Sequence, residues 1–223
     1  MTHYEPAPGQ PTVADFDTEA RHALTASVRR LIDATLTSER LDDATMLAAR
    51  ATLDAVADTL VDGEPEPGVR SRFEGTHADY LPRSPVVGRC SPMAPPVQIR
   101  MVGTRLVGDV TFGAAYEGPP GYVHGGVLAL VFDEVLGMVN LGSDHPGMTA
   151  VLTVKYRRPT PLYRPTVLEG WVERVEGRKA ITRGRITVDG EVTAEVEGLF
   201  VTPDMERIME YFGRRDETPD PLP

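Results

Sequence analysis

The order of periodicities along the second half of the chain constrains its fold more than any other feature. One apolar segment with helical spacing, at about residues 124–141, stands between segments with the period of two that is typical of β-strands. Residues 105–112 alternate before it, and further strand candidates follow it at 149–156, 166–175, 180–188 and 191–201. Asp189-Gly190 is a strong hairpin signal between the last two. This order predicts an α+β fold in which an antiparallel sheet packs against one long helix.

The rest of the chain differs in composition from this predicted domain. Two helical patterns occupy its first part, with Ser38 as a candidate N-cap between them. The proline-rich stretch at 82–96 is expected to run extended over the surface. We therefore divide the chain into a disordered tail (1–14), an N-terminal helical extension (15–61), a proline-rich linker (62–95), the sheet-and-helix domain (96–202) and a C-terminal tail (203–223).

Composition narrows the classes of function that the chain can have. A formal net charge of −10 argues against general affinity for nucleic acid or anionic membranes. No uncharged apolar run approaches the roughly 18 residues of a membrane span, and the first residues lack the pattern of a signal peptide, so we expect a cytoplasmic protein. The single cysteine, Cys90, excludes an internal disulfide, and the five histidines have no ligand spacing. We expect neither a metal nor a cofactor.

The start of the long helix carries residues that a purely structural helix would not need. In GYVHGGVLALVFDEVLG, residues 121–137, His124 and two glycines begin the helix, and Asp133 lies inside its apolar stretch. The first N–H groups of a helix have no internal partner and carry the positive end of its dipole. Gly125 and Gly126 leave these groups open to an approaching carbonyl. A tight turn that leads into a helix is the alternative reading of the glycines.

These residues, with the segment that follows them, resemble a known family. HGG, an aspartate nine residues after the histidine, and TAVLTVKYRRPTPL at 149–162 are similar to the hotdog-fold acyl-CoA thioesterases of the PaaI-like type. The match covers about residues 96–202. The resemblance implies a sheet wrapped around a central helix, an acyl-CoA substrate, and a homodimer with paired sites at its interface. Pairing of dimers into a tetramer stays open.

The resemblance also implies roles for particular residues. Gly125 would donate its N–H to the thioester carbonyl, and Thr149 would hydrogen-bond the attacking water or the Asp133 carboxylate. Asp133 would act either as the base that activates water or as a nucleophile, and the sequence does not choose between these. Gly126 is a candidate substrate-binding residue. His124 either orients the loop or binds substrate.

Spacing along the helix indicates that one chain cannot supply a complete site. Gly125 and Asp133 are eight residues apart, which corresponds to about 12 Å along a helix. An aspartate side chain cannot cross that gap. Two such helices that pair antiparallel about a two-fold axis would bring each Asp133 near the partner's Gly125.

Basic residues at predicted strand ends suggest where coenzyme A phosphates could bind. Arg157 and Arg158 are the principal candidates, with Arg178 and Lys179 beside a later turn. The competing functions are a hydratase and a non-catalytic module that binds acyl-CoA or a protein. By resemblance, a hydratase would carry a histidine five residues after the aspartate, where this chain has Met138. Glu134 is expected to be a solvated or ion-paired neighbour of the aspartate.

Overall fold

The computed structural model describes residues 17–61 and 82–202. The chain divides into two compact units, Met1–Pro82 and Arg83–Pro223. The predicted tails at 1–14 and 203–223, and most of the predicted linker at 62–95, lie outside the described residues.

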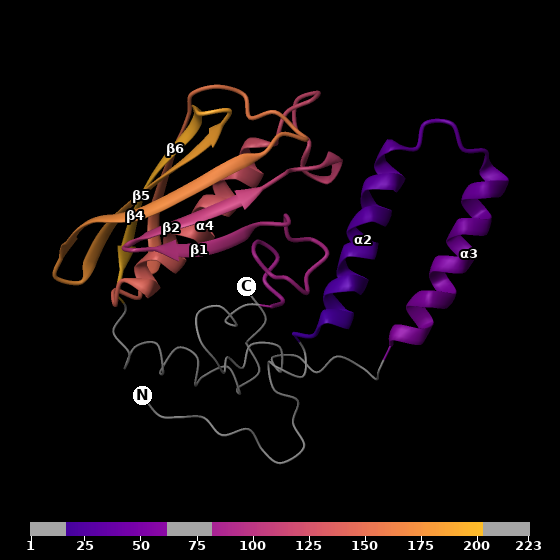
Figure 1. Ribbon diagram of the computed structural model, residues 1–223, viewed down its shortest axis with the longest axis horizontal. Coiled ribbons are helices and arrows are strands. Elements are labelled where there is room, and N and C mark those ends of the chain that lie inside the picture. The colour runs from indigo at the N-terminus through magenta and orange to yellow at the C-terminus, as the bar shows by residue number, and fades with distance from the viewer. Residues whose placement is uncertain (1–16, 62–81, 203–223) are drawn as a thin grey trace, which may run out of the picture. The chain divides into compact units, whose positions relative to one another are not determined.

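The described part of the first unit, residues 17–61, consists of two helices, α2 (Glu19–Thr37) and α3 (Asp43–Leu60), shown in Figure 1. Thr18 caps α2 by accepting a hydrogen bond from the Arg21 N–H at 3.2 Å. Asp42 caps α3 through the Thr45 N–H at 2.7 Å, and this bond lowers the pKa of the Asp42 carboxyl. The prediction that Ser38 is an N-cap is wrong, because Ser38 ends α2 and its hydroxyl bonds back to the Ala34 carbonyl.

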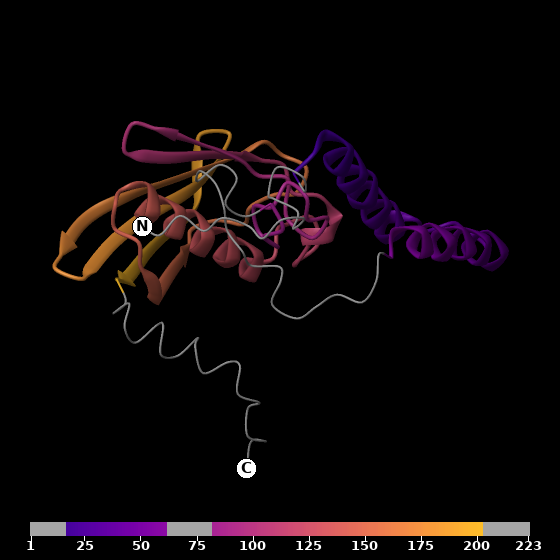
Figure 2. The same ribbon diagram turned by 90° about the horizontal axis from the view of Figure 1, so that it is seen from below.

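The second unit is a six-stranded antiparallel sheet with one long helix, α4 (Gly125–Gly142), along one face (Figures 1 and 2). The strand order is β1-β2-β4-β5-β6-β3, so the strand that follows α4 in sequence forms one edge of the sheet. The strands are β1 (Gln98–Val102), β2 (Arg105–Val110), β3 (Met148–Tyr156), β4 (Thr166–Glu176), β5 (Lys179–Val188) and β6 (Glu191–Val201). This arrangement confirms the predicted α+β hotdog fold with its central helix.

Helix α4 packs closely because the middle of the sheet is lined by small residues. A Cβ added at Gly170 would come within 3.0 Å of Val139, and one at Gly198 within 3.0 Å of Leu136. The glycines therefore let the helix approach the strands, and its apolar face is removed from water. By length and composition alone α4 could also cross a membrane, but here it is the core helix of the domain. Its buried residues are Leu128, Val131, Phe132, Val135, Leu136, Val139 and Asn140.

The described end of the predicted linker packs into the domain instead of running over its surface. Residues 82–96 form successive turns, and Val86 and Ala94 are 4% and 0% exposed. Ser84 is also buried, and its hydroxyl oxygen accepts the Val86 N–H at 3.1 Å. The surface expectation is therefore wrong for this stretch, because its apolar side chains between the prolines join the core.

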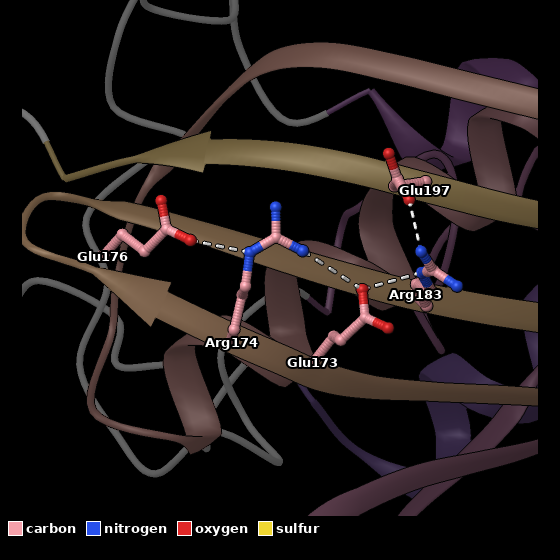
Figure 3. Close-up of polar contacts among 5 residues, drawn as sticks. All are labelled: Glu173, Arg174, Glu176, Arg183 and Glu197. Atoms are coloured by element: carbon pink, nitrogen blue, oxygen red, sulfur yellow. Dashed lines mark hydrogen bonds and ion pairs between the residues drawn. The ribbon is translucent and has the colours of Figure 1, made fainter.

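The outer face of the sheet carries a ladder of charged side chains, part of which is shown in Figure 3. Arg183 contacts Glu173 at 2.9 Å and Glu197 at 2.8 Å, while Arg174 contacts Glu176 at 2.8 Å. These side chains are one-third or more exposed, so each pair contributes little to stability. The alternation along the strands thus separates a solvated charged face from the apolar face under α4.

Candidate active site

His124 caps helix α4 and fixes its first turn. Its Nδ1 accepts the Gly126 N–H at 3.0 Å, which places the ring proton of the neutral side chain on Nε2. Its carbonyl oxygen accepts the N–H groups of Val127 and Leu128 at 3.0 and 3.3 Å. Among the described residues, no acceptor is seen for the Gly125 N–H. One of the two predicted glycine donors is thus occupied by the cap, and the other is open.

Asp133 and Thr149 lie together in the same chain. The Thr149 hydroxyl donates a hydrogen bond of 2.7 Å to Oδ1 of the Asp133 carboxylate. Asp133 is half-buried on α4, and Thr149 is exposed at the start of the edge strand β3. The bond fixes one carboxylate oxygen and leaves the other available for a further partner.

A β-bulge decides which side chains of β3 reach α4. Thr149 and Tyr156 are seven residues apart, so a regular strand would point them to opposite faces. The register shifts between Thr149 and Val151, and this irregularity reverses the alternation. Thr149 therefore contacts Asp133, and Tyr156 contacts Gly125 through a hydrogen bond from its hydroxyl to the Gly125 carbonyl at 2.8 Å. Tyr156 is not among the site residues predicted from the sequence, because periodicity alone gives no sign of the bulge.

Glu134 is half-buried, and within the described part of the chain it has no ion-pair partner, so the predicted solvated or ion-paired position is wrong for at least one of its carboxylate oxygens. Its Oε1 is shielded from solvent and has no hydrogen-bond partner there. Burial raises the pKa of the Glu134 carboxyl, and the nearby negative charge of Asp133 raises it further, while a hydrogen bond from Ser84 opposes the shift. A second carboxyl thus lies beside Asp133 in an environment that favours its neutral form.

The two arginines predicted to contact phosphate are each paired with a glutamate. Arg157 contacts Glu195 at 2.7 Å, and Arg158 contacts Glu191 at 2.6 Å. The backbone N–H groups of both arginines donate to the Thr193 carbonyl, at 2.8 and 3.0 Å. Both side chains remain more than half exposed, so an incoming phosphate would have to compete with the glutamates. Coenzyme A contact at these residues stays a prediction.

A pocket of about 420 Å³ opens on the outer face of the sheet and does not include the helix residues of the candidate site. Arg157 is its only lining residue among the predicted site residues, and charged groups of both signs surround it. It lies over the strands that carry the ion-pair ladder. Its lining residues include Lys155, Trp171, Arg183, Arg185, Glu195 and Glu197.

Comparisons with known proteins show which family the domain resembles and which part of the chain it covers. The family described as "Thioesterase superfamily" matches residues 120–195, which contain the helix start, Asp133 and Thr149. Curated relatives include the acyl-coenzyme A thioesterase THEM4 of Xenopus laevis, 37% identical over 91 residues (40% of this chain, 41% of the relative). The Mus musculus protein of the same name is 34% identical over 108 residues (48% of this chain, 46% of the relative). The chain thus matches less than half the length of these relatives.

A solved structure is similar over most of the chain. It is described as the crystal structure of a thioesterase superfamily protein and is 38% identical to this chain, with a TM-score of 0.74. The match covers 83% of this chain and 92% of that one.

Proposed function

Because the chain belongs to the thioesterase superfamily, we propose that it hydrolyses acyl-CoA thioesters to a carboxylic acid and free coenzyme A. The observation that carries this proposal is the hydrogen bond between Asp133 on the core helix and Thr149 on β3. In it, the Thr149 hydroxyl holds the Asp133 carboxylate. The names of the curated relatives support the substrate class. The match to those relatives is partial, so the activity is a proposal for this chain.

Asp133 and the start of α4 can perform the two tasks that hydrolysis requires. As a base, Asp133 takes a proton from water, and the hydroxide attacks the thioester carbonyl carbon. The carbonyl oxygen gains negative charge, which the Gly125 N–H and the helix dipole stabilise. The C–S bond then breaks, and the departing thiolate recovers the proton. As a nucleophile, the Asp133 carboxylate would instead attack the carbonyl carbon and displace the coenzyme A thiolate as the C–S bond breaks, which leaves a mixed anhydride. Water then hydrolyses the anhydride to the carboxylic acid and the free Asp133 carboxylate, and its second proton goes to the thiolate.

Two copies of the chain are needed to assemble this site. Gly125 and Asp133 are separated by about 12 Å along α4, so they cannot act on the same carbonyl within one chain. The outer edge of β3 is unpaired in the described sheet, and it exposes Met148 and Val151 at 59% and 52%. An exposed apolar strand edge favours pairing with another chain. We propose a homodimer through this edge, with antiparallel α4 helices that place each Asp133 near the second copy's Gly125.

The first experiment is the Asp133→Asn substitution, assayed by thiol release from short, medium, long and aromatic acyl-CoA. We expect kcat to fall at least about 100-fold while acyl-CoA binding is retained, because the amide can neither accept a proton nor attack the thioester. Asp144→Asn is the matched control, since Asp144 is exposed and its positive φ of 59° suits asparagine. A wild-type protein that binds acyl-CoA but hydrolyses none of the panel would instead support the non-catalytic module.

Mixed dimers test whether the site is shared between chains. Asp133→Asn and Gly125→Ala chains, each with strongly reduced activity alone, are co-expressed with different tags and purified as heterodimers. One of the two sites in such a dimer then has both groups intact, so activity should return to about half that of the wild type. Heterodimers no more active than the two single variants would refute the shared site without refuting hydrolysis itself.

A further inference from the structure

The peptide group between Gly125 and Gly126 is hydrogen-bonded at both of its ends. Its carbonyl oxygen accepts the Tyr156 hydroxyl at 2.8 Å. Its N–H donates to Nδ1 of His124 at 3.0 Å. The first peptide of helix α4 is thus held by side chains from β3 and from the cap residue, in addition to the bonds of the helix itself.

The preceding peptide group, between His124 and Gly125, is fixed at one end only. Its carbonyl accepts the N–H groups of Val127 and Leu128, while its Gly125 N–H has no acceptor among the described residues. Gly125 joins the two peptides, and a glycine can rotate about its own backbone bonds more freely than other residues. Holding the peptide on the far side of Gly125 therefore restricts the direction in which the open N–H points.

The ring of Tyr156 also occupies the space beside Gly125. A Cβ added at Gly125 would meet Tyr156 Cζ and the hydroxyl oxygen, each at 3.3 Å. The end of β3 is itself anchored, because the Arg157 N–H donates to the Thr193 carbonyl at 2.8 Å. Tyr156 is 53% exposed in the single chain, so within that chain its position depends on these local contacts rather than on burial in the core.

We infer that Tyr156 is a positioning residue, which aims the Gly125 N–H at the thioester carbonyl by fixing the peptide that follows it. The inference rests on the proposed function. It assigns Tyr156 a task that does not require contact with the substrate. A donor preorganised in this way stabilises the developing negative charge without reorganising during the reaction.

The test compares Tyr156→Phe, which keeps the ring and removes the hydroxyl, with Tyr163→Phe as the control. Tyr163 is 55% exposed and lies outside the proposed site. We expect Tyr156→Phe to lower kcat about tenfold with KM changed less than about twofold, because the donor is misaligned while substrate contacts remain. Tyr163→Phe should keep the wild-type values. A tyrosine that only supported folding would change thermal stability and leave kcat per folded protein unaltered.

A second measurement needs no substrate. In protein labelled with ¹⁵N-glycine, the Gly126 nitrogen is bonded to the carbonyl carbon of Gly125, whose oxygen accepts the Tyr156 hydrogen bond. Its resonance should move in Tyr156→Phe and stay in place in Tyr163→Phe. An unmoved Gly126 resonance, or a moved one with wild-type kcat, would overturn the inference. If the proposed function itself were wrong, the wild-type protein would hydrolyse no acyl-CoA, and this result is distinct from either outcome above.

Discussion

Glu134→Gln should stabilise the protein at neutral pH, although glutamate is ordinarily a harmless residue on a helix. One Glu134 oxygen is shielded from solvent without a partner, and Asp133 adds a like charge. A buried unpaired polar group costs about 1–3 kcal/mol, and more where it is charged; glutamine keeps the polar atom but removes the charge. The hydrogen bond from Ser84 and the partial exposure of the side chain reduce this cost, so we expect Glu134→Gln to gain about 1 kcal/mol. That gain corresponds to a rise in Tm of about 2–4 °C.

The gain should depend on pH in a definite direction. The pKa of Glu134 is raised in the folded protein above its ordinary value of 4.5, so the folded state holds the proton more tightly than the unfolded state does. The contribution of the protonated Glu134 to wild-type stability is therefore fully present below that ordinary value and is lost as the pH rises through the folded pKa. The variant lacks this loss. The two proteins should be similar at about pH 4 and differ at about pH 8.

Urea denaturation at both pH values and a fixed protein concentration measures this difference. Glu176→Gln is the control, because the Glu176 side chain is 67% exposed and its substitution should change stability by less than about 0.5 kcal/mol. A Glu134→Gln protein that is no more stable than wild type at about pH 8, or is equally stabilised at about pH 4, would refute the reasoning.

Further substitutions probe the proposed site and the sheet surface. Thr149→Val removes the hydroxyl that holds the Asp133 carboxylate, so kcat should fall about 10- to 100-fold with little change in KM in a steady-state thioester assay. Thr149→Ser keeps a hydroxyl and should retain most of the wild-type kcat. Gly125→Ala places a methyl group 3.3 Å from Tyr156 and beside the open N–H, so kcat should fall about 10- to 100-fold. The melting temperature Tm should change by no more than about 2 °C in a thermal melt. Arg183→Ala breaks two exposed ion pairs and should cost less than about 1 kcal/mol in urea denaturation; a larger loss would show that the ladder acts as a cooperative network.

Local signals were sufficient for the elements of the domain and for part of the candidate site. The alternation of residues 180–188 and 191–201, with Asp189-Gly190 between them, predicted the hairpin of β5 and β6. His124 and the glycines after it predicted where α4 begins, because the first N–H groups of a helix have no partner within the helix and one of them is satisfied by a capping side chain. Side-chain periods and caps are properties of a few neighbouring residues, so the sequence displays them directly.

Contacts between distant segments were decided by the tertiary structure. The bulge in β3 turns Tyr156 toward Gly125, and no periodicity in the sequence marks its position. Arg157 looked like a free cation in the sequence, but the register of β3 with β6 sets it beside Glu195. Glu134 was predicted to be solvated or ion-paired, yet it lies half-buried and its Oε1 has no hydrogen-bond partner among the described residues.

The sequence by itself thus determined that one helix begins at a pair of glycines, carries a carboxylate two turns further on, and stands among antiparallel strands. Only the folded chain decided which side chains meet that helix, because strand register and a single extra residue in a bulge select the face to which each side chain points. Periodicity is written in neighbouring residues, whereas burial and pairing depend on segments far apart in the chain.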